Sequence, residues 1–517
     1  MPALVDKIRA LFRGKGQDKA IISVHSDRIV VVLSILSVFL LGLPLWWTTT
    51  RVYRADLPST QIAQYTHSDV LEIPFNFYVD SPRISPETVQ GLVDAKLAKS
   101  RLPYRSDKLQ VAFTAQVQHG PAPDLPGHYT VETREEGGVA IVGTGRSMQI
   151  PVTTTTDANE AAAKWIARIV GKEEREVRAA EGRALKYSPE YAVTFTLINE
   201  DPTGGLSVDW KIEQALAVYL QPFIDTVSPL TKLSVSSQVL HHAGPLPVTP
   251  QRAANHTYLT TDALPHFINS AGWNLASTDP VSPMLNFILF VPKRDSQPLL
   301  ILDDHRTQSN TNAFLIPQWG GIAVANFPES AHGHVMISQA DLQAYMGIFI
   351  AQLRQLLGVR SDTPLPSVKD RVIVQRATAT GISGWEFDAQ ARRWLANNRQ
   401  TAVTTLSSLI TLVESMQNMV VMDNIKDQVD ASLAALAKIS RARIAVDHAR
   451  ACQDAIVAAT KAEGAFFDPS MVSMLYFPDQ HKYAIYLPFF LPVAIPLFHA
   501  LKRVAKDVVA KRKTKTE

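Results

Sequence analysis

The sequence predicts a mixed α/β domain with a helical C-terminal part, flanked by two transmembrane helices. Two apolar stretches without Asp, Glu, Lys or Arg, residues 29–47 and 483–501, lie near the two ends of the 517-residue chain. Strand-like and helix-like segments alternate over residues 70–357, which is typical of helices layered on a sheet. Over residues 385–462 the pattern is helical.

Residues 29–47 fit a membrane-spanning helix. At about 1.5 Å per residue this helix would cover about 28 Å, close to the hydrocarbon thickness of a bilayer. Trp46 and Trp47 close the stretch, and indole rings favour the membrane–water interface. A cleaved signal peptide is the alternative, but it requires a shorter apolar run followed by small residues. The sequence favours a retained anchor.

Residues 483–501 fit a second span, with Tyr483 at its interface end. Pro488, Pro492 and Pro496 recur every four residues, so they lie near one face of a helix. Each proline removes a backbone donor, and in lipid the freed carbonyl groups need other partners. Two interpretations stay open: a kinked span, or a face that packs against the helices of a partner.

Lysine and arginine residues predict the orientation, because they concentrate on the cytoplasmic side of membrane proteins. They cluster before the first span and after the second at Lys7, Arg9, Arg13, Lys15, Lys19, Arg28, Lys502, Arg503, Lys506, Lys511, Arg512, Lys513 and Lys515. Residues 1–28 and 502–517 are therefore predicted to be cytoplasmic tails, and the domain between the spans lies on the opposite side.

A further apolar stretch, residues 401–422, has the length of a third span. Glu414, Gln417 and Asn418 lie in its second half, and charged or amide side chains are costly in lipid. A third span would also move the basic C-terminal tail to the other side of the membrane. A buried or membrane-surface helix is favoured.

The region between the spans divides into an α/β domain, residues 48–365, and a helical region, residues 366–482. The predicted strands cover residues 70–79, 109–117, 129–132, 139–150, 191–198, 232–240, 285–291, 299–302 and 320–327. One predicted helix begins at Ser85. Three others cover residues 159–185, 209–224 and 339–357, and Ser338 caps the last of them. The strand pair 129–132 and 139–150 is expected to be joined through residues 135–138.

We assign no catalytic, metal-binding or cofactor-binding residue and expect no cofactor. Residues 143–148 (GTGRSM) lack the last glycine of a dinucleotide fingerprint, and residues 381–384 (GISG) are one residue short of a nucleophile elbow. Residues 303–305 (Asp-Asp-His) follow a predicted strand, where solvated turn residues are favoured over a metal site. Residues 241–242 (His-His) have no companion ligand at metal spacing.

Cys452 and His448 stand four residues apart on a predicted helix and could face the same way. A Cys–His catalytic pair needs that proximity, because a base must activate the thiol. A packed thiol is favoured, since buried cysteines commonly act as small hydrophobic residues. As the single cysteine, Cys452 cannot form an intramolecular disulfide. The net charge of +3 indicates no nucleic-acid partner.

Two short signals concern processing and targeting. Residues 255–257 (Asn-His-Thr) form a glycosylation sequon, which predicts a glycan on Asn255. Lys513 and Lys515 stand fifth and third from the C-terminus and resemble a cytosolic dilysine retrieval signal. A plain basic tail on an anionic leaflet is an equally supported interpretation.

The segments that flank the two spans resemble the PIG-S family, a subunit of the glycosylphosphatidylinositol (GPI) transamidase. The similar segments are residues 42–50 (GLPLWWTTT), 53–58 (YRADLP), 384–386 (GWE), 465–470 (AFFDPS), 475–479 (LYFPD) and 483–488 (YAIYLP). Both spans and their flanks are included, whereas residues 100–360 match by layout only.

The resemblance implies a protein of the endoplasmic reticulum membrane with cytoplasmic termini and a luminal domain. The transamidase removes a C-terminal signal from a precursor and joins the new carboxyl end to the GPI lipid. In that family the catalytic cysteine and histidine belong to another subunit, PIG-K. The expected partners are PIG-K, PIG-T, PIG-U, the remaining subunit and membrane lipid.

We therefore expect a non-catalytic, scaffolding subunit that holds the catalytic subunit near the membrane. Two alternatives stay open. One is a membrane-tethered luminal hydrolase that uses Cys452 and His448. The other is a membrane adaptor without an enzymatic link.

Overall fold

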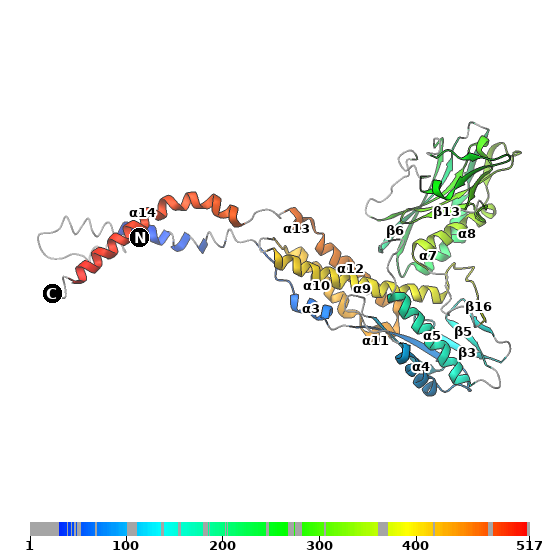
Figure 1. Cartoon of the computed structure of the whole chain (residues 1–517), viewed down its shortest axis with the longest axis horizontal. Coiled ribbons are helices and arrows are strands. Elements are labelled where there is room, and N and C mark those ends of the chain that lie inside the picture. The colour runs from blue at the N-terminus through cyan, green and yellow to red at the C-terminus, as the bar shows by residue number, and fades with distance from the viewer. Residues whose placement is uncertain are drawn as a thin grey trace. The chain divides into compact units, whose positions relative to one another are not determined.

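The computed structural model describes most of the chain between residues 30 and 513. The described residues are 30–38, 40–42, 44–45, 48, 53–67, 70–100, 111–135, 139–152, 157–178, 185, 187–201, 203, 205–243, 248–266, 273, 282–303, 307–359, 371–416, 419–473 and 479–513. The chain forms two compact units. Figure 1 colours the chain from blue at the N-terminus to red at the C-terminus. Unit 1 contains Met1–Ser59, Leu406–Val429 and Glu463–Glu517, and unit 2 contains Thr60–Thr405 and Asp430–Ala462.

Unit 2 contains a six-stranded sheet with the strand order β16-β4-β5-β3-β1-β2. Its strands are β1 (Leu71–Val79), β2 (Val111–His119), β3 (His128–Arg134), β4 (Val139–Val142), β5 (Ser147–Pro151) and β16 (Arg371–Val374). All neighbours are parallel except β4 and β5. β1 is buried along almost its whole length, as expected for a central parallel strand with both faces covered. The first sheet is therefore organised around β1.

A five-stranded sheet in unit 2 has the order β13-β14-β11-β6-β8. Its strands are β6 (Glu190–Asn199), β8 (Lys232–His241), β11 (Met284–Val291), β13 (Ala313–Ile316) and β14 (Gly320–Val324). Only β13 is antiparallel to its neighbour. Its central strands β6 and β11 are buried along almost their whole length, as expected for parallel strands covered on both faces.

Two smaller sheets and the connecting helices complete this α/β part. The strands are β7 (Leu206–Trp210) with β15 (Gly333–Ile337), and β9 (Gln251–Arg252), β10 (Thr257–Thr260) and β12 (Leu299–Leu302). The helices are α3 (Ser59–His67), α4 (Pro86–Ser100), α5 (Ala158–Arg178), α6 (Ile212–Ala215), η2 (Leu216–Leu220), α7 (Gln221–Val227), η3 (Thr261–His266), η4 (Arg294–Ser296) and α8 (Gln339–Leu356). The cap predicted at Ser338 is confirmed, because its side chain accepts a hydrogen bond from the backbone of Asp341.

The C-terminal part is helical, as predicted. Its helices are α9 (Gly384–Ser415), α10 (Asp423–Lys438), α11 (Arg441–Val446), α12 (His448–Phe466), α13 (Pro469–Ser473) and α14 (Asp479–Lys513). In the apolar second half of α9, Leu406, Leu409 and Val413 are buried while Ser408 and Thr411 are exposed. α9 therefore has one buried and one polar face there, which is typical of a helix packed in a protein.

The structure corrects two details of the predicted strands. β3 does not pair with β4: it lies parallel to β5, and β4 pairs with β5 and β16. The reversal falls at residues 143–146, after β4, because glycines there permit a tight turn. β16 lies in the region predicted to be helical and forms the edge of the first sheet.

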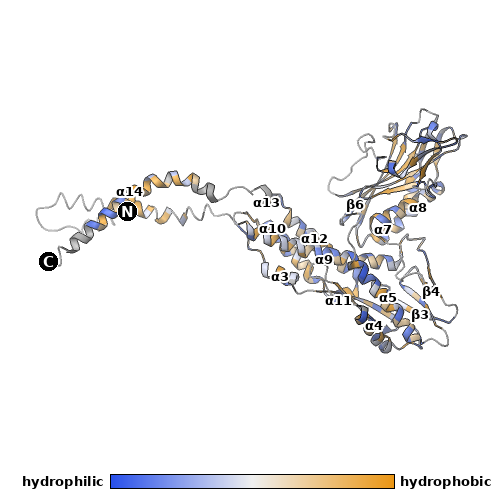
Figure 2. Cartoon of the chain, viewed as in Figure 1, coloured by the Kyte–Doolittle hydropathy of each residue, from blue (hydrophilic) through white to orange (hydrophobic). Residues whose placement is uncertain are grey.

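The two predicted spans stay predictions. Within the described residues, no helix combines the length and the apolar character needed to cross a bilayer. Residues 30–38 are helical, and α14 contains Tyr483, the three prolines and Lys513. Figure 2 shows a hydrophobic stretch along α14. Trp46, Trp47 and Lys515 lie outside the described residues.

Candidate functional site

The polar residues singled out in the sequence lie in turns and loops. Asn255 is exposed between β9 and β10. Asp303 accepts a hydrogen bond from the backbone N–H of Thr307 at 2.7 Å, while residues 304–306 lie outside the described part. Residues 241–242 are exposed at the end of β8. No group of His, Cys, Asp and Glu side chains among the described residues could hold a metal ion.

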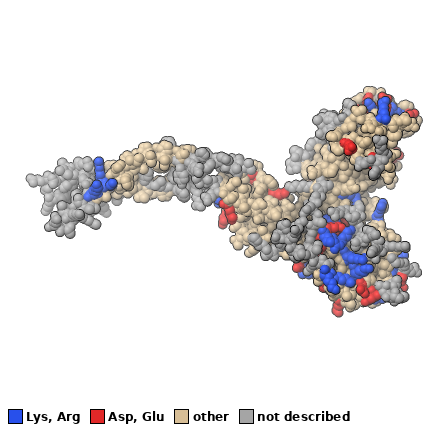
Figure 3. Space-filling view, viewed as in Figure 1, with Lys and Arg blue, Asp and Glu red and all other residues tan. Residues whose placement is uncertain are grey.

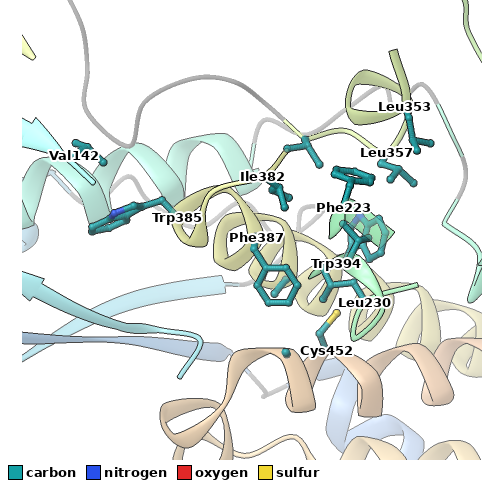
Figure 4. Packing of buried hydrophobic residues seen from close by; sticks show 14 of the residues in the cluster. Val142, Phe223, Leu230, Leu353, Leu357, Ile382, Trp385, Phe387, Trp394 and Cys452 are labelled. Atoms are coloured by element: carbon teal, nitrogen blue, oxygen red, sulfur yellow. The ribbon is translucent and has the colours of Figure 1, made fainter. Parts of the chain in front are cut away.

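Cys452 lies in the core of unit 2. It is fully buried, and burial raises the pKa of its thiol. Figure 4 shows its sulfur pointing toward Leu230 and Trp394. An attacking cysteine needs a lowered pKa and access to substrate. The environment of Cys452 is therefore that of a packed hydrophobic residue.

His448 is held in its neutral form by two partners. Its Nε2 lies 2.9 Å from the carbonyl oxygen of Pro74, so Nε2 carries the proton and donates. Its Nδ1 lies 3.4 Å from Nη1 of Arg392, which donates to it. Both ring nitrogens are thus engaged with groups other than Cys452.

Arg392 of α9 is a fully buried charge. Its guanidinium carbon lies 4.2 Å from the ring centroid of Phe75, and its Nη1 donates to the hydroxyl of Tyr129 at 2.5 Å. The carboxylate of Glu173 on α5 lies 3.5 Å from its Nε. Ring faces and a carboxylate thus replace the water that this cation gives up on burial.

Asp388, one turn before Arg392, is also fully buried. Its two carboxylate oxygens accept hydrogen bonds from Arg146 Nε at 2.8 Å and Nη2 at 2.9 Å. One oxygen also accepts from the backbone N–H of Gly127 at 2.9 Å. This bidentate pair is the geometry in which arginine and carboxylate interact most strongly.

The first turn of α9 fits tightly against the first sheet. The ring of Trp385 stacks on Tyr129 with centroids 4.2 Å apart and planes within 19°. Its indole N–H donates to the carbonyl of Ser147 at 3.4 Å. A Cβ atom at Gly384 would lie 2.8 Å from the carbonyl oxygen of Gly145, which is too close for any larger residue without a backbone shift.

The same turn is joined to helix α8, which packs on β14 of the second sheet. Glu386 forms a salt bridge with Arg354, with Nη2 2.6 Å and Nη1 3.2 Å from its two oxygens. Ser383 and Glu386 also cap the helix reciprocally, at 3.3 Å and 2.8 Å. Residues of one helical turn therefore contact the first sheet directly and the second sheet through α8.

We call Gly384, Trp385, Glu386, Asp388 and Arg392 the α9 joint. Two motifs rejected as catalytic in the sequence meet there. Residues 143–148 contain the turn between β4 and β5, which presents Arg146 to Asp388, and the first two residues of β5. Residues 381–384 form the cap of α9. Their glycines and serine therefore serve the turn, the cap and the close approach of backbones.

Charged residues extend the joint to α5, where Figure 3 shows Lys and Arg side chains gathered. Glu176 accepts a hydrogen bond from Arg393 of α9 at 3.0 Å and lies 3.4 Å from Lys172. These side chains are only partly exposed, so the pairing is less screened than that of surface ions. The α9 joint thus combines aromatic packing with ion pairs, and these contacts connect α9 to α5 and to the first sheet.

The protonation of His448 makes stability depend on pH. Burial and the charge of Arg392 lower the pKa of His448 to about 3, against about 6.5 in an unfolded chain. Between these values the unfolded state binds more protons than the folded state. The contribution of His448 to the free energy of unfolding is therefore fully present above pH 6.5 and decreases as pH falls. We expect this group to remove on the order of 2 kcal/mol between pH 6.5 and 5, measured by denaturant unfolding.

The matched variant is His448→Gln, which cannot take up a proton in this range. It should show a weaker decrease of unfolding free energy between the same two pH values than the unchanged protein. Equal pH dependence in the two proteins would contradict the assignment.

Sequence reasoning missed Arg146, Asp388 and Arg392. For Asp388 and Arg392 the available signal was two charges four positions apart within the apolar pattern at the start of a long helix. The resemblance of residues 384–386 to the family includes Trp385 and Glu386.

Comparisons with known proteins identify the family. A family model described as PIG-S, phosphatidylinositol-glycan biosynthesis class S protein, matches residues 33–511. The chain is 31% identical over 520 residues to the GPI-anchor transamidase component PIGS of Bos taurus, covering 90% of this chain and 93% of that protein.

Fungal proteins are also similar. The GPI transamidase component PIG-S homolog of Schizosaccharomyces pombe is 29% identical over 342 residues, covering 65% of this chain and 57% of that protein. The GPI transamidase component GPI17 of Saccharomyces cerevisiae is 25% identical over 517 residues, covering 92% and 91%. Because the family model extends over most of the chain, this protein belongs to the PIG-S family.

Proposed function

We propose that this chain is a non-catalytic subunit of the GPI transamidase, the complex that attaches the GPI anchor to the C-terminus of precursor proteins. The observation that carries the proposal is the family match over residues 33–511, together with relatives named as transamidase components. The nucleophile belongs to another subunit in this proposal. The buried thiol of Cys452, with its raised pKa, supports that assignment.

Replacing Cys452 by alanine tests the non-catalytic role. In cells that lack their own copy of this subunit, the Cys452→Ala variant should restore surface display of a GPI-anchored reporter to the level of the unchanged chain. The comparison is made at equal protein abundance, because removing a buried sulfur leaves a small cavity. Loss of display at equal abundance would favour the hydrolase alternative, in which Cys452 and His448 act together.

The proposal includes a two-span topology in the endoplasmic reticulum membrane. Residues 29–47 and 483–501 are the spans, residues 1–28 and 502–517 are cytoplasmic, and residues 48–482 are luminal. Exposed apolar side chains on the described helices support it: Val31, Leu33, Val38, Leu40, Leu41, Leu45, Ile485, Leu487, Leu491, Val493, Ile495 and Phe498. Protease added to sealed microsomes should leave the luminal domain intact and remove only the tails. Digestion of the domain from outside would overturn the topology.

Smaller assignments follow from this topology. Asn255 would lie in the lumen, where its sequon can be glycosylated. Trp46, Trp47 and Tyr483 would lie at the membrane interface. Pro488, Pro492 and Pro496 would face partner helices, and Lys513 with Lys515 would form the retrieval signal. Each is tested by its own substitution: loss of Asn255, for example, should remove one glycan from the electrophoretic pattern.

The proposed partners are the PIG-K, PIG-T and PIG-U subunits and the remaining member of the complex. Purification of the tagged chain in mild detergent should recover a cysteine-protease-like subunit. Recovery of the chain with no such protein would favour the adaptor alternative.

Anchoring at both ends gives this subunit a physical role. The reaction joins a peptide to a lipid headgroup, so it must take place near the membrane. A domain tied to the bilayer at two points cannot swing away from it. Deleting either span while keeping the other should therefore lower transamidation, and full activity after either deletion would make double anchoring irrelevant.

A further inference from the structure

Four large side chains of unit 1 remain exposed where three segments of the chain meet. Tyr53 and Phe467 are 55% and 67% exposed, and Met416 and Met422 are 37% and 46% exposed. We call these residues the juxtamembrane patch. Aromatic and methionine side chains left in water on one compact unit usually mark a contact with another phase or another molecule.

Hydrogen bonds bring two of these segments together. The backbone N–H of Val421 donates to the carbonyl of Tyr53 at 3.3 Å, and the N–H of Ala55 donates to the carbonyl of Val421 at 2.9 Å. The hydroxyl of Tyr53 donates to the carboxylate of Asp423 at 2.7 Å. Tyr53 therefore lies beside the segment that contains Met422.

The third segment joins them at the end of α12. The amide of Asn424 donates to the carboxylate of Asp468 at 2.9 Å. Asp468 also accepts from the backbone and the hydroxyl of Ser470 at 2.9 Å and 2.6 Å, and these hydrogen bonds lower its pKa. Phe467, next to Asp468, is thereby placed near Met422. The carboxylates beside the patch are satisfied by protein donors, which reduces the cost of bringing them toward a less polar medium.

The short segment between the first proposed span and Tyr53 limits how far the juxtamembrane patch can lie from the membrane. The first proposed span ends at residue 47, and a fully extended chain from there to Tyr53 reaches at most about 20 Å. Tyr53 must therefore stay within that distance of the membrane interface. Amphipathic and apolar side chains held at this distance are suited to the interfacial layer, where tyrosine is enriched.

We propose that the juxtamembrane patch rests in the luminal interface of the bilayer, so that unit 1 contacts lipid through Tyr53, Met416, Met422 and Phe467. This inference rests on the proposed two-span topology. The contact adds a third point of attachment, made by side chains of the α9–α10 connection and the end of α12. It limits rotation of the unit about the two proposed spans.

Fluorescence quenching in the full chain tests this contact. The buried Cys452 is replaced by alanine, and one cysteine is introduced by Phe467→Cys to carry an NBD label. The chain is reconstituted, with the subunits that copurify, into nanodiscs of phosphatidylcholine with or without nitroxide-labelled lipid. We expect a blue-shifted emission that nitroxide lipid quenches at least twofold. Ser408→Cys is the control, since Ser408 is exposed in the same unit about 12 Å earlier along α9 than Met416.

The outcomes separate the explanations. Emission typical of water at residue 467 overturns the proposal, and so does a blue shift without lipid quenching, which indicates a covering protein. Equal quenching at residues 408 and 467 also overturns it, because the contact would not be local. If Phe467→Cys prevents folding, Met422→Cys is measured with the same criteria.

The proposed function is checked separately by copurification and by protease protection of the same preparation. Correct topology with an unquenched label rejects the lipid contact alone. Quenching in a chain that copurifies with no transamidase subunit rejects the function alone.

Discussion

Asp388→Ala will lower the free energy of unfolding by about 3–5 kcal/mol, the usual cost of removing one partner from a buried ion pair. The carboxylate is fully buried and accepts three hydrogen bonds, two from Arg146 and one from the backbone of Gly127. Without it, the guanidinium of Arg146 loses two hydrogen bonds and the N–H of Gly127 loses its acceptor. Denaturant unfolding of the purified chain measures the change.

Asp124 provides a matched control, because it pairs with the same arginine. Its carboxylate lies 3.2 Å from Nη1 of Arg146, but its side chain is fully exposed. Asp124→Ala should leave the unfolding curve unchanged within error, since exposed ion pairs contribute little. Equal effects of the two substitutions would show that burial does not determine the strength of this pair.

Trp385→Ala will destabilise unit 2 by about 3–5 kcal/mol, the range for removing a buried aromatic side chain. The indole is nearly fully buried and stacks on Tyr129, which in turn accepts the hydrogen bond of Arg392. Its loss leaves a cavity beside a buried charge. Because losses of this size lower the abundance of a protein in cells, the amount of this subunit should also fall.

Trp385→Phe is the control for the shape of the site. It keeps an aromatic ring against Tyr129 and loses only part of the volume and the hydrogen bond to Ser147. We expect a loss of about 1–2 kcal/mol, measured in the same unfolding experiment. A loss as large as that of the alanine variant would mean that stacking on Tyr129 contributes little.

The strands that the sequence predicts best are those buried on both faces. β1, β6 and β11 are rich in β-branched and aromatic residues, which is a direct signal for a strand. The sequence predicts one strand over residues 139–150, joined to 129–132 through residues 135–138. The structure has two strands there, β4 and β5, and β3 pairs in parallel with the second. The edge strand β16 is short and pairs with β4 from far along the chain, so its own residues carry little information.

The α9 joint was only partly predictable for a related reason. Residues 384–386 resemble the family, and the pattern of α9 indicates a helix. The partners of Asp388 and Arg392 are Arg146 and Tyr129, more than two hundred positions earlier. A local pattern cannot pair residues at that separation. It shows only that two charges occupy positions where apolar residues are expected.

The partner of Tyr53 has a consequence for biosynthesis. Tyr53 and Asp423 are 370 residues apart, so at about 5–20 residues per second the ribosome needs about 20–70 s to complete the contact. The segment that contains Tyr53 lacks its contact with Asp423 throughout that interval, while the sheets between them in the chain are already able to fold. Nascent chains that stop before residue 421 would therefore expose this segment, and chaperones would bind it before the contact forms.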